Sequence, residues 1–232
     1  MKSRSLSILR TSFVAVAAVA AATTCLVPAV AFAGGKKAPA PRPAKEYAVF
    51  ETHPAEKVTV AIDPCMRQDD CDFFRLPYIR HSMIPVRVII TNDSDTTLDL
   101  DEARMQFISG SSDRLPAATQ DDLNRRLFST KQAKGGSHIP LTPIPIHHAP
   151  IDKKIMQDDE DFGFRSTQVT PHSTMAGYLF YDVKDLDEPP LKGAEIYVKM
   201  IRFFGGKELF AFTLPFDKWL ATQKSTSNHA SQ

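Results

Sequence analysis

The stretch Ile84-Pro85-Val86-Arg87-Val88-Ile89-Ile90-Thr91 decides the fold. Val86, Val88 and Ile90 alternate with Arg87 and Ile89, and this period of two is typical of a largely buried strand. The run Asn92-Asp93-Ser94-Asp95 follows at once and predicts a turn, because such side chains bond to their own backbone. A buried strand that enters a turn is the unit from which antiparallel sheets are built.

Further short strands are predicted on both sides of this stretch. The pattern of period two places them at 47–51, 57–62, 97–101, 104–109, 175–183, 195–203 and 208–214. Phe204-Gly205-Gly206-Lys207 joins the last two as a hairpin turn, because paired glycines supply the positive φ that tight primed turns need. Seven or eight short strands predict an all-β chain that folds as an antiparallel β-sandwich or barrel.

Two short helices and a long insertion interrupt this pattern. Thr119 can cap a helix that runs to Phe128, and Pro215 can begin a last helix. Residues 130–170 form the insertion, which is Pro-rich from Ile139 to Ile146 and has a helical pattern from Ile151 to about Asp161. So long a connection is unusual in a compact sandwich, which predicts either disorder or a surface with a function.

Two segments carry a resemblance to a known family. The run 92–95 with Leu98-Asp99-Leu100, and the stretch from Pro171 to Phe180, resemble parts of small secreted bacterial immunoglobulin-like domains. The resemblance implies an immunoglobulin-like sandwich with an extracytoplasmic binding or structural use, and it assigns no catalytic residue. The insertion departs from that family's compact pattern. The family's disulfide between the two sheets is also missing, since Cys65 and Cys71 are too close in sequence.

The first 33 residues predict export. Lys2, Arg4 and Arg10 precede a small apolar run, and Ala31-Phe32-Ala33 is an A-x-A site just before Gly34. These features predict a signal peptide over 1–33 and a periplasmic or extracellular protein. The alternatives are an uncleaved anchor and a lipid-modified Cys25, but the apolar run is interrupted and the residues before Cys25 fit a lipobox poorly.

Removal of the leader changes both length and charge. Taking 33 residues from 232 leaves 199, and taking three of the 28 basic residues leaves 25 against 27 acidic ones, a net charge of −2. Such a chain lacks the basic footprint of nucleic-acid binding, so nucleic acid is not expected as a partner. No second apolar run is long enough to span a bilayer. Residues 34–45 are predicted as a disordered Pro-rich linker and 222–232 as a disordered tail, which leaves one domain over 46–221.

Cys65 and Cys71 remain after the leader is cleaved. An even pair in an oxidising compartment predicts one disulfide, and closure of so short a loop stabilises by about 2 kcal/mol. A redox pair and a metal site are the alternatives, although redox motifs favour two intervening residues rather than five.

A metal site is the sharpest chemical hypothesis. His138, His147 and His148 lie near one another in the insertion and could bind a soft divalent ion. The alternative is that they are exposed loop histidines without a ligand. The acidic run 158–161 is predicted to be a solvated face, and no cofactor is expected.

The sequence shows no nucleophile elbow and no phosphate-binding glycine motif. Aromatic side chains gather at 73–78 and 178–181, where core packing is expected and an exposed patch is the alternative. We therefore expect a non-catalytic module of the envelope or periplasm, which binds a protein or an envelope component through the insertion and loops. The alternatives are a periplasmic metal-binding module that uses the three insertion histidines, and a hydrolase, which requires a pocket with perturbed titrating groups.

Overall fold

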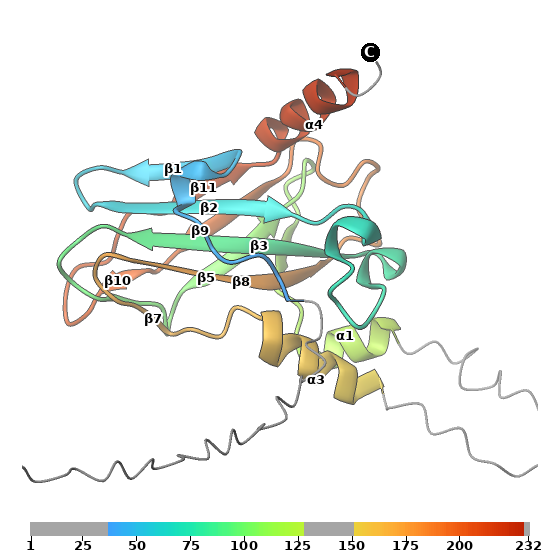
Figure 1. Cartoon of the computed structure of the whole chain (residues 1–232), viewed down its shortest axis with the longest axis horizontal. Coiled ribbons are helices and arrows are strands. Elements are labelled where there is room, and N and C mark those ends of the chain that lie inside the picture. The colour runs from blue at the N-terminus through green and yellow to red at the C-terminus, as the bar shows by residue number, and fades with distance from the viewer. Residues whose placement is uncertain (1–36, 128–150, 230–232) are drawn as a thin grey trace, which may run out of the picture. The chain divides into compact units, whose positions relative to one another are not determined.

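The computed structural model describes residues 37–127 and 151–229. These residues form a mostly β protein with three antiparallel sheets (Figure 1). The front sheet has the order β1 (Val49–His53), β2 (Val58–Pro64), β3 (Met83–Asn92) and β8 (Ser173–Asp182). The back sheet has the order β11 (Phe212–Pro215), β9 (Glu195–Lys199), β5 (Arg104–Ile108) and β6 (Arg114–Pro116). A small sheet joins β10 (Arg202–Phe203), β4 (Leu98–Asp99) and β7 (Gln168–Val169).

The front and back sheets enclose the main hydrophobic core. Val86, Val88 and Ile90 of β3 belong to the same buried cluster as Phe107 of β5 and Val198 of β9. Every residue of β3 is buried, since further segments cover the outer face of the front sheet as well. Because both faces of β3 are covered, the 84–91 stretch is apolar at most positions and not only at alternate ones. The sandwich-like, antiparallel all-β prediction is confirmed at this level.

Two smaller clusters cover the outer face of the front sheet. One joins the loop after β2, which holds the 3-10 turns η2 (Gln68–Cys71) and η3 (Tyr78–His81), to the helices α1 (Gln120–Leu127) and α3 (Ile151–Phe162). The other forms around the 3-10 turn η1 (Ala44–Glu46), whose Ala44 lies with Tyr47 on Ala61, Ile89 and Ala176. The small Ala61 and Ala176 side chains leave room for the chain to approach the sheet.

The aromatic side chains pack in the interior, as expected. Phe74 contacts the rings of Tyr78, Phe162, Tyr178 and Phe180 at centroid distances of 5.1–5.5 Å. Tyr178 and Phe180, about a hundred residues after Phe74, therefore join it in one cluster between the front sheet and α3, whereas Tyr181 lies in the main core.

Some predicted elements differ from the structure. The single strand predicted over 195–203 is divided into β9 and β10, which belong to different sheets, because Met200 between them has a φ of 63°. The predicted helices are present as α1, α3 and α4 (Asp217–His229), and Thr119 exchanges hydrogen bonds with Asp122 at the start of α1. Strand β6 has no counterpart in the prediction.

The predicted boundaries differ at both ends. Residues from Lys37 to Lys45 of the expected linker lie on the domain, where Ala44 is buried and its backbone N–H donates to Thr91 Oγ1 at 2.8 Å. Helix α4 continues through Thr222 to His229, into the expected tail, since no proline or glycine interrupts it. The Pro-rich part of the insertion lies outside the described residues. None of the helices that are described is long and apolar enough to cross a membrane.

Candidate functional site

The outer face of the front sheet carries a polar row across three neighbouring strands. The register pairs Asp63 of β2 with Arg87 of β3, and Arg87 with Tyr178 of β8. Directly opposite residues on adjacent strands point to the same side of the sheet. The next row on this face is Ala61, Ile89 and Ala176, which η1 covers. The polar row therefore lies between the two clusters that cover this face, and its Tyr178 belongs to the cluster that α3 covers.

A segment that we call the strap, Lys37–Arg42, crosses this face. In Figure 1 it is the blue chain that runs over β3 and β8 before it reaches η1. Arg87 Nη2 donates a hydrogen bond to the Pro39 carbonyl oxygen at 2.5 Å. The strap is exposed from Pro39 to Arg42, and its Ala38 is partly buried against the cluster that α3 covers, so it lies on the surface of the fold.

Two hollows flank the strap. The disulfide hollow has a volume of about 710 Å³ and lies between the strap, the Cys65–Cys71 loop and Trp219 of α4. The α3 hollow has a volume of about 420 Å³ and lies between the strap, Arg75 and Phe162. Pro39, Ala40, Arg87 and Tyr178 line both hollows. The two hollows are therefore neighbours on either side of the strap, and together we call them the depression.

Arg87 is the central group of this depression. It is 6% exposed, its guanidinium lies 5.9 Å from the centroid of the Tyr178 ring, and Asp63 is its cross-strand neighbour. A buried guanidinium keeps several planar donors available for an acceptor that enters the hollow.

Burial dominates the acid–base properties of its two neighbours. It raises the pKa of Asp63, and the charge of Arg87 and a hydrogen bond from Trp219 only partly oppose this effect. Burial also raises the pKa of Tyr178 to about 12, again against the charge of Arg87. The row combines a cation, a carboxyl group with weakened acidity and a phenol that stays protonated.

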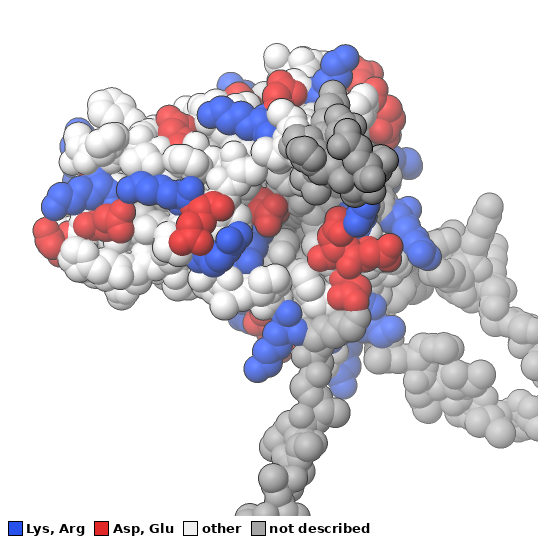
Figure 2. All heavy atoms as spheres, turned by 45° about the horizontal axis from the view of Figure 1, so that its top comes forward, with Lys and Arg blue, Asp and Glu red and all other residues white. Residues whose placement is uncertain are grey.

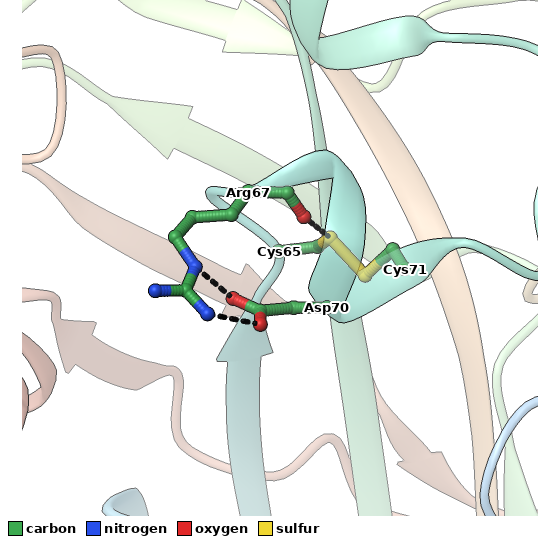
Figure 3. The surroundings of a disulfide bond; sticks show 4 residues. All are labelled: Cys65, Arg67, Asp70 and Cys71. Atoms are coloured by element: carbon green, nitrogen blue, oxygen red, sulfur yellow. Dashed lines mark hydrogen bonds and ion pairs between the residues drawn. A yellow bond between two sulfur atoms is a disulfide. The ribbon is translucent and has the colours of Figure 1, made fainter.

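The disulfide forms the rim of the larger hollow. Cys65 and Cys71 are bonded, with 6.3 Å between their Cα atoms, so the predicted pair is present. Figure 3 shows Arg67 and Asp70 inside this loop, joined by hydrogen bonds of 3.1 and 3.0 Å. The Arg67 carbonyl oxygen lies 3.4 Å from Cys65 Sγ. The loop thus engages its own charged side chains.

Helix α3 is fixed beside the smaller hollow by a buried carboxylate. Asp158 is fully buried and accepts hydrogen bonds from Arg75 Nη1 at 2.8 Å and from the Tyr78 hydroxyl at 3.0 Å. Burial, followed by the charge of Asp158, raises the pKa of Tyr78 and keeps its hydroxyl a donor. The prediction that the acidic run 158–161 is a solvated face is therefore wrong for Asp158, which faces Arg75 and Tyr78.

The predicted metal ligands His138, His147 and His148 lie outside the described residues, so that site stays a prediction. Within 37–127 and 151–229, no three His, Cys, Asp or Glu residues are grouped as a metal site would require. His53 instead lies between Glu51 and Glu56, at 3.2 and 3.0 Å, and stacks on Phe212. This arrangement ties the edge of the front sheet to β11.

Comparison with known proteins gave no match: no protein-family model, curated protein or solved structure matches this chain.

Sequence reasoning did not identify the polar row. Arg87 stood out only as the single charge in an apolar strand, and Asp63 only as the residue before Pro64. The signal available in the sequence was a single charged residue, Arg87, within an otherwise apolar strand.

Proposed function

We propose that the protein is an exported, non-catalytic binding module of the bacterial envelope or periplasm, which takes its partner in the depression over Arg87. The partner is a protein or another envelope component. The signal-peptide pattern of residues 1–33 supports export. The observation that carries the binding role is Arg87 itself, a buried guanidinium that opens into two hollows and engages a backbone carbonyl.

The groups around the larger hollow support binding over hydrolysis. General acid–base hydrolysis by carboxyl groups commonly uses two of them. Burial raises the pKa of Asp63 in the hollow, as the hydrolase alternative requires, but Asp70 on the rim is held by two hydrogen bonds to Arg67. Trp219, Tyr178 and Arg87 are residue types that dominate binding sites.

Charge supports recognition by local contacts. On the face in Figure 2, Lys and Arg side chains lie among Asp and Glu side chains. The mature chain carries a net charge of only −2 once the three basic leader residues are removed from 28 against 27 acidic ones. Long-range steering of a polyanion needs a field of one sign, and these charges do not favour it.

The immunoglobulin-like identity of the sandwich belongs to the same proposal. Two four-stranded antiparallel sheets around one core and the resemblance at 92–100 and 171–180 support it. The short-range disulfide and the strand order β1-β2-β3-β8 give it features of its own.

Site-specific photo-crosslinking in intact cells tests the function. A benzoylphenylalanine replaces Gln223, which is exposed and lines the larger hollow, or Lys207, which is exposed in the turn after β10, far from α4 in Figure 1. We expect a discrete adduct from position 223 and none from 207, in an envelope fraction whose mature chain begins at Gly34. Equal labelling from both positions, or no adduct from 223, contradicts the binding role.

The metal-binding alternative has its own test. Calorimetry of the mature chain with Cu²⁺ and Zn²⁺ compares wild type with the triple variant His138→Ala, His147→Ala, His148→Ala. Saturable binding tighter than about 10 μM that the triple variant loses would favour the metal module, since isolated surface histidines reach weaker affinities unaided.

A further inference from the structure

We propose that the depression over Arg87 recognises an extended, proline-rich peptide segment, and that the strap Lys37–Arg42 occupies this peptide site in the free protein. This inference rests on the proposed function, because it names the partner's chemistry at the same site.

The occupant seen in the structure defines the chemistry. The strap and the residue after it read Lys37-Ala38-Pro39-Ala40-Pro41-Arg42-Pro43, in which every second residue from Pro39 is proline. Proline has no N–H and a fixed φ, so such a segment is extended and presents its carbonyls as free acceptors. Pro43 has φ −51° and ψ 138°, which is the polyproline II region.

The depression offers what such a segment needs. Polyproline II segments bind in grooves lined by aromatic rings, where donors engage their carbonyls. Here Tyr178, Tyr47 and Trp219 line the larger hollow, and Arg87 supplies the donor to the Pro39 carbonyl. Arg87 of the polar row therefore already makes, with Pro39 of the strap, the hydrogen bond that we assign to the partner segment.

The strap is held weakly compared with the chain that follows it. Ala44 is buried and its N–H donates to Thr91 Oγ1, which anchors η1 to the sheet. The described strap residues make two hydrogen bonds, from Arg87 to Pro39 and from the Arg42 N–H to the Tyr47 hydroxyl at 3.4 Å. Their other contacts are an exposed ion pair of Arg42 with Glu46, the Arg42 guanidinium over the Tyr47 ring, and the partly buried Ala38. Since Pro39, Ala40 and Pro41 are exposed, the strap can leave while η1 stays in place.

Displacement joins the two hollows. The volumes of about 710 and 420 Å³ on the two sides of Pro39 and Ala40 become one groove along Arg87 and Tyr178. A partner segment competes with a strap whose effective concentration is in the millimolar range for a short tether. The apparent affinity of the free protein for the partner is reduced accordingly.

The test uses the single tryptophan of the chain, Trp219, as the probe, since it lines the larger hollow. Its fluorescence is followed while the mature chain, beginning at Gly34, is titrated with acetyl-KAPAPRPA-amide, the sequence of residues 37–44. The matched control peptide is acetyl-KAAAARAA-amide. A double variant, Pro39→Gly with Pro41→Gly, loosens the strap in the otherwise intact mature chain.

We expect the proline peptide to bind the double variant about tenfold more tightly than wild type, because the competing strap no longer holds its extended form. The alanine peptide should produce no saturable change. Arg87→Met in the loosened background should abolish the response. Arg87→Lys, which keeps the buried charge and loses the planar fork, should weaken it with an unchanged circular dichroism spectrum.

Equal responses to the two peptides, or none in the double variant, overturn the inference. So does a wild-type dimer in light scattering that the double variant loses, because it would assign the groove to the strap of a second copy. Adducts from position 223 without a peptide response would leave the proposed function standing and refute only the peptide class. Absence of both the adduct and the peptide response would refute the proposed function and the peptide inference together.

Discussion

Arg75 and Asp158 are joined by three donor contacts across 83 positions of sequence. The Arg75 backbone N–H reaches both carboxylate oxygens at 3.2 and 3.1 Å, and its Nη1 donates to Oδ1 at 2.8 Å. Asp158 is fully buried, whereas the Arg75 side chain is 33% exposed. The pair attaches α3 to the loop after β2 and so builds one wall of the smaller hollow.

Removal of this carboxylate should destabilise the fold. Asp158→Ala leaves the Tyr78 hydroxyl and the Arg75 N–H without their acceptor, which costs about 3 kcal/mol. Glu160→Ala, an exposed position in the same acidic run, should change stability by less than about 0.5 kcal/mol. Urea unfolding of both variants measures the difference, and similar losses would contradict the assigned role of Asp158.

The aromatic cluster makes a second prediction. Phe74→Ala removes a ring that contacts five others, and should cost about 3–5 kcal/mol. Phe210→Ala is the matched control, since that side chain is 72% exposed, and it should be nearly neutral. Thermal unfolding followed by circular dichroism compares the two. A mild Phe74 phenotype would show that the cluster is not packed as described.

A third prediction concerns the close approach of β8 to the chain after α3. A Cβ on Gly177 would lie 2.7 Å from the Gly163 carbonyl oxygen and closer still to the Phe164 backbone. Gly177→Ala should therefore cost about 1–3 kcal/mol through overpacking. Gly206→Ala meets its nearest atom, Phe203 Cβ, at 3.5 Å, an ordinary contact, and should cost less. Chemical denaturation of both variants tests this order.

Asp63 makes a pH-dependent prediction. Burial raises its pKa in the folded state above that of the unfolded chain. As pH rises above the unfolded value of about 3.9, the unfolded chain releases its proton first, so folding stability falls until the folded group has also ionised. Asp63→Asn removes this loss.

The stability of Asp63→Asn relative to wild type should therefore rise from pH 4 to pH 7, as measured by unfolding midpoints across that range. Asp185→Asn, at an exposed site, controls for the general effect of removing a carboxylate. A relative stability that falls with pH would reverse the direction assigned to Asp63.

The disulfide makes the last prediction. Removal of the Cys65–Cys71 bond should cost about 2 kcal/mol, because the closed loop is short. The double variant Cys65→Ala, Cys71→Ala should unfold at the same denaturant concentration with and without reductant, whereas wild type should shift. If reductant leaves the unfolding midpoint of wild type unchanged, the disulfide does not contribute to the stability of the folded protein.

Local pattern accounts for much of the framework. The period of two predicted β3, β5 and β8, turn chemistry predicted the loop at 92–95, and Thr119 marked the start of α1. These features depend on neighbours within a few residues, which the sequence displays directly. The break at Met200 escaped prediction because no local pattern marks a methionine that takes a positive φ.

The candidate site lies beyond such local signals. The sequence by itself determined the long strands of the two main sheets, and it predicted the Cys65–Cys71 pair. Only the tertiary structure decided that Asp63, Arg87 and Tyr178 form one row, because that depends on the register of strands up to 91 positions apart. It also decided that Asp158 is buried and that Pro39 lies on Arg87. Strand pattern tells which face a residue takes, whereas register and the covering segments decide what it meets there.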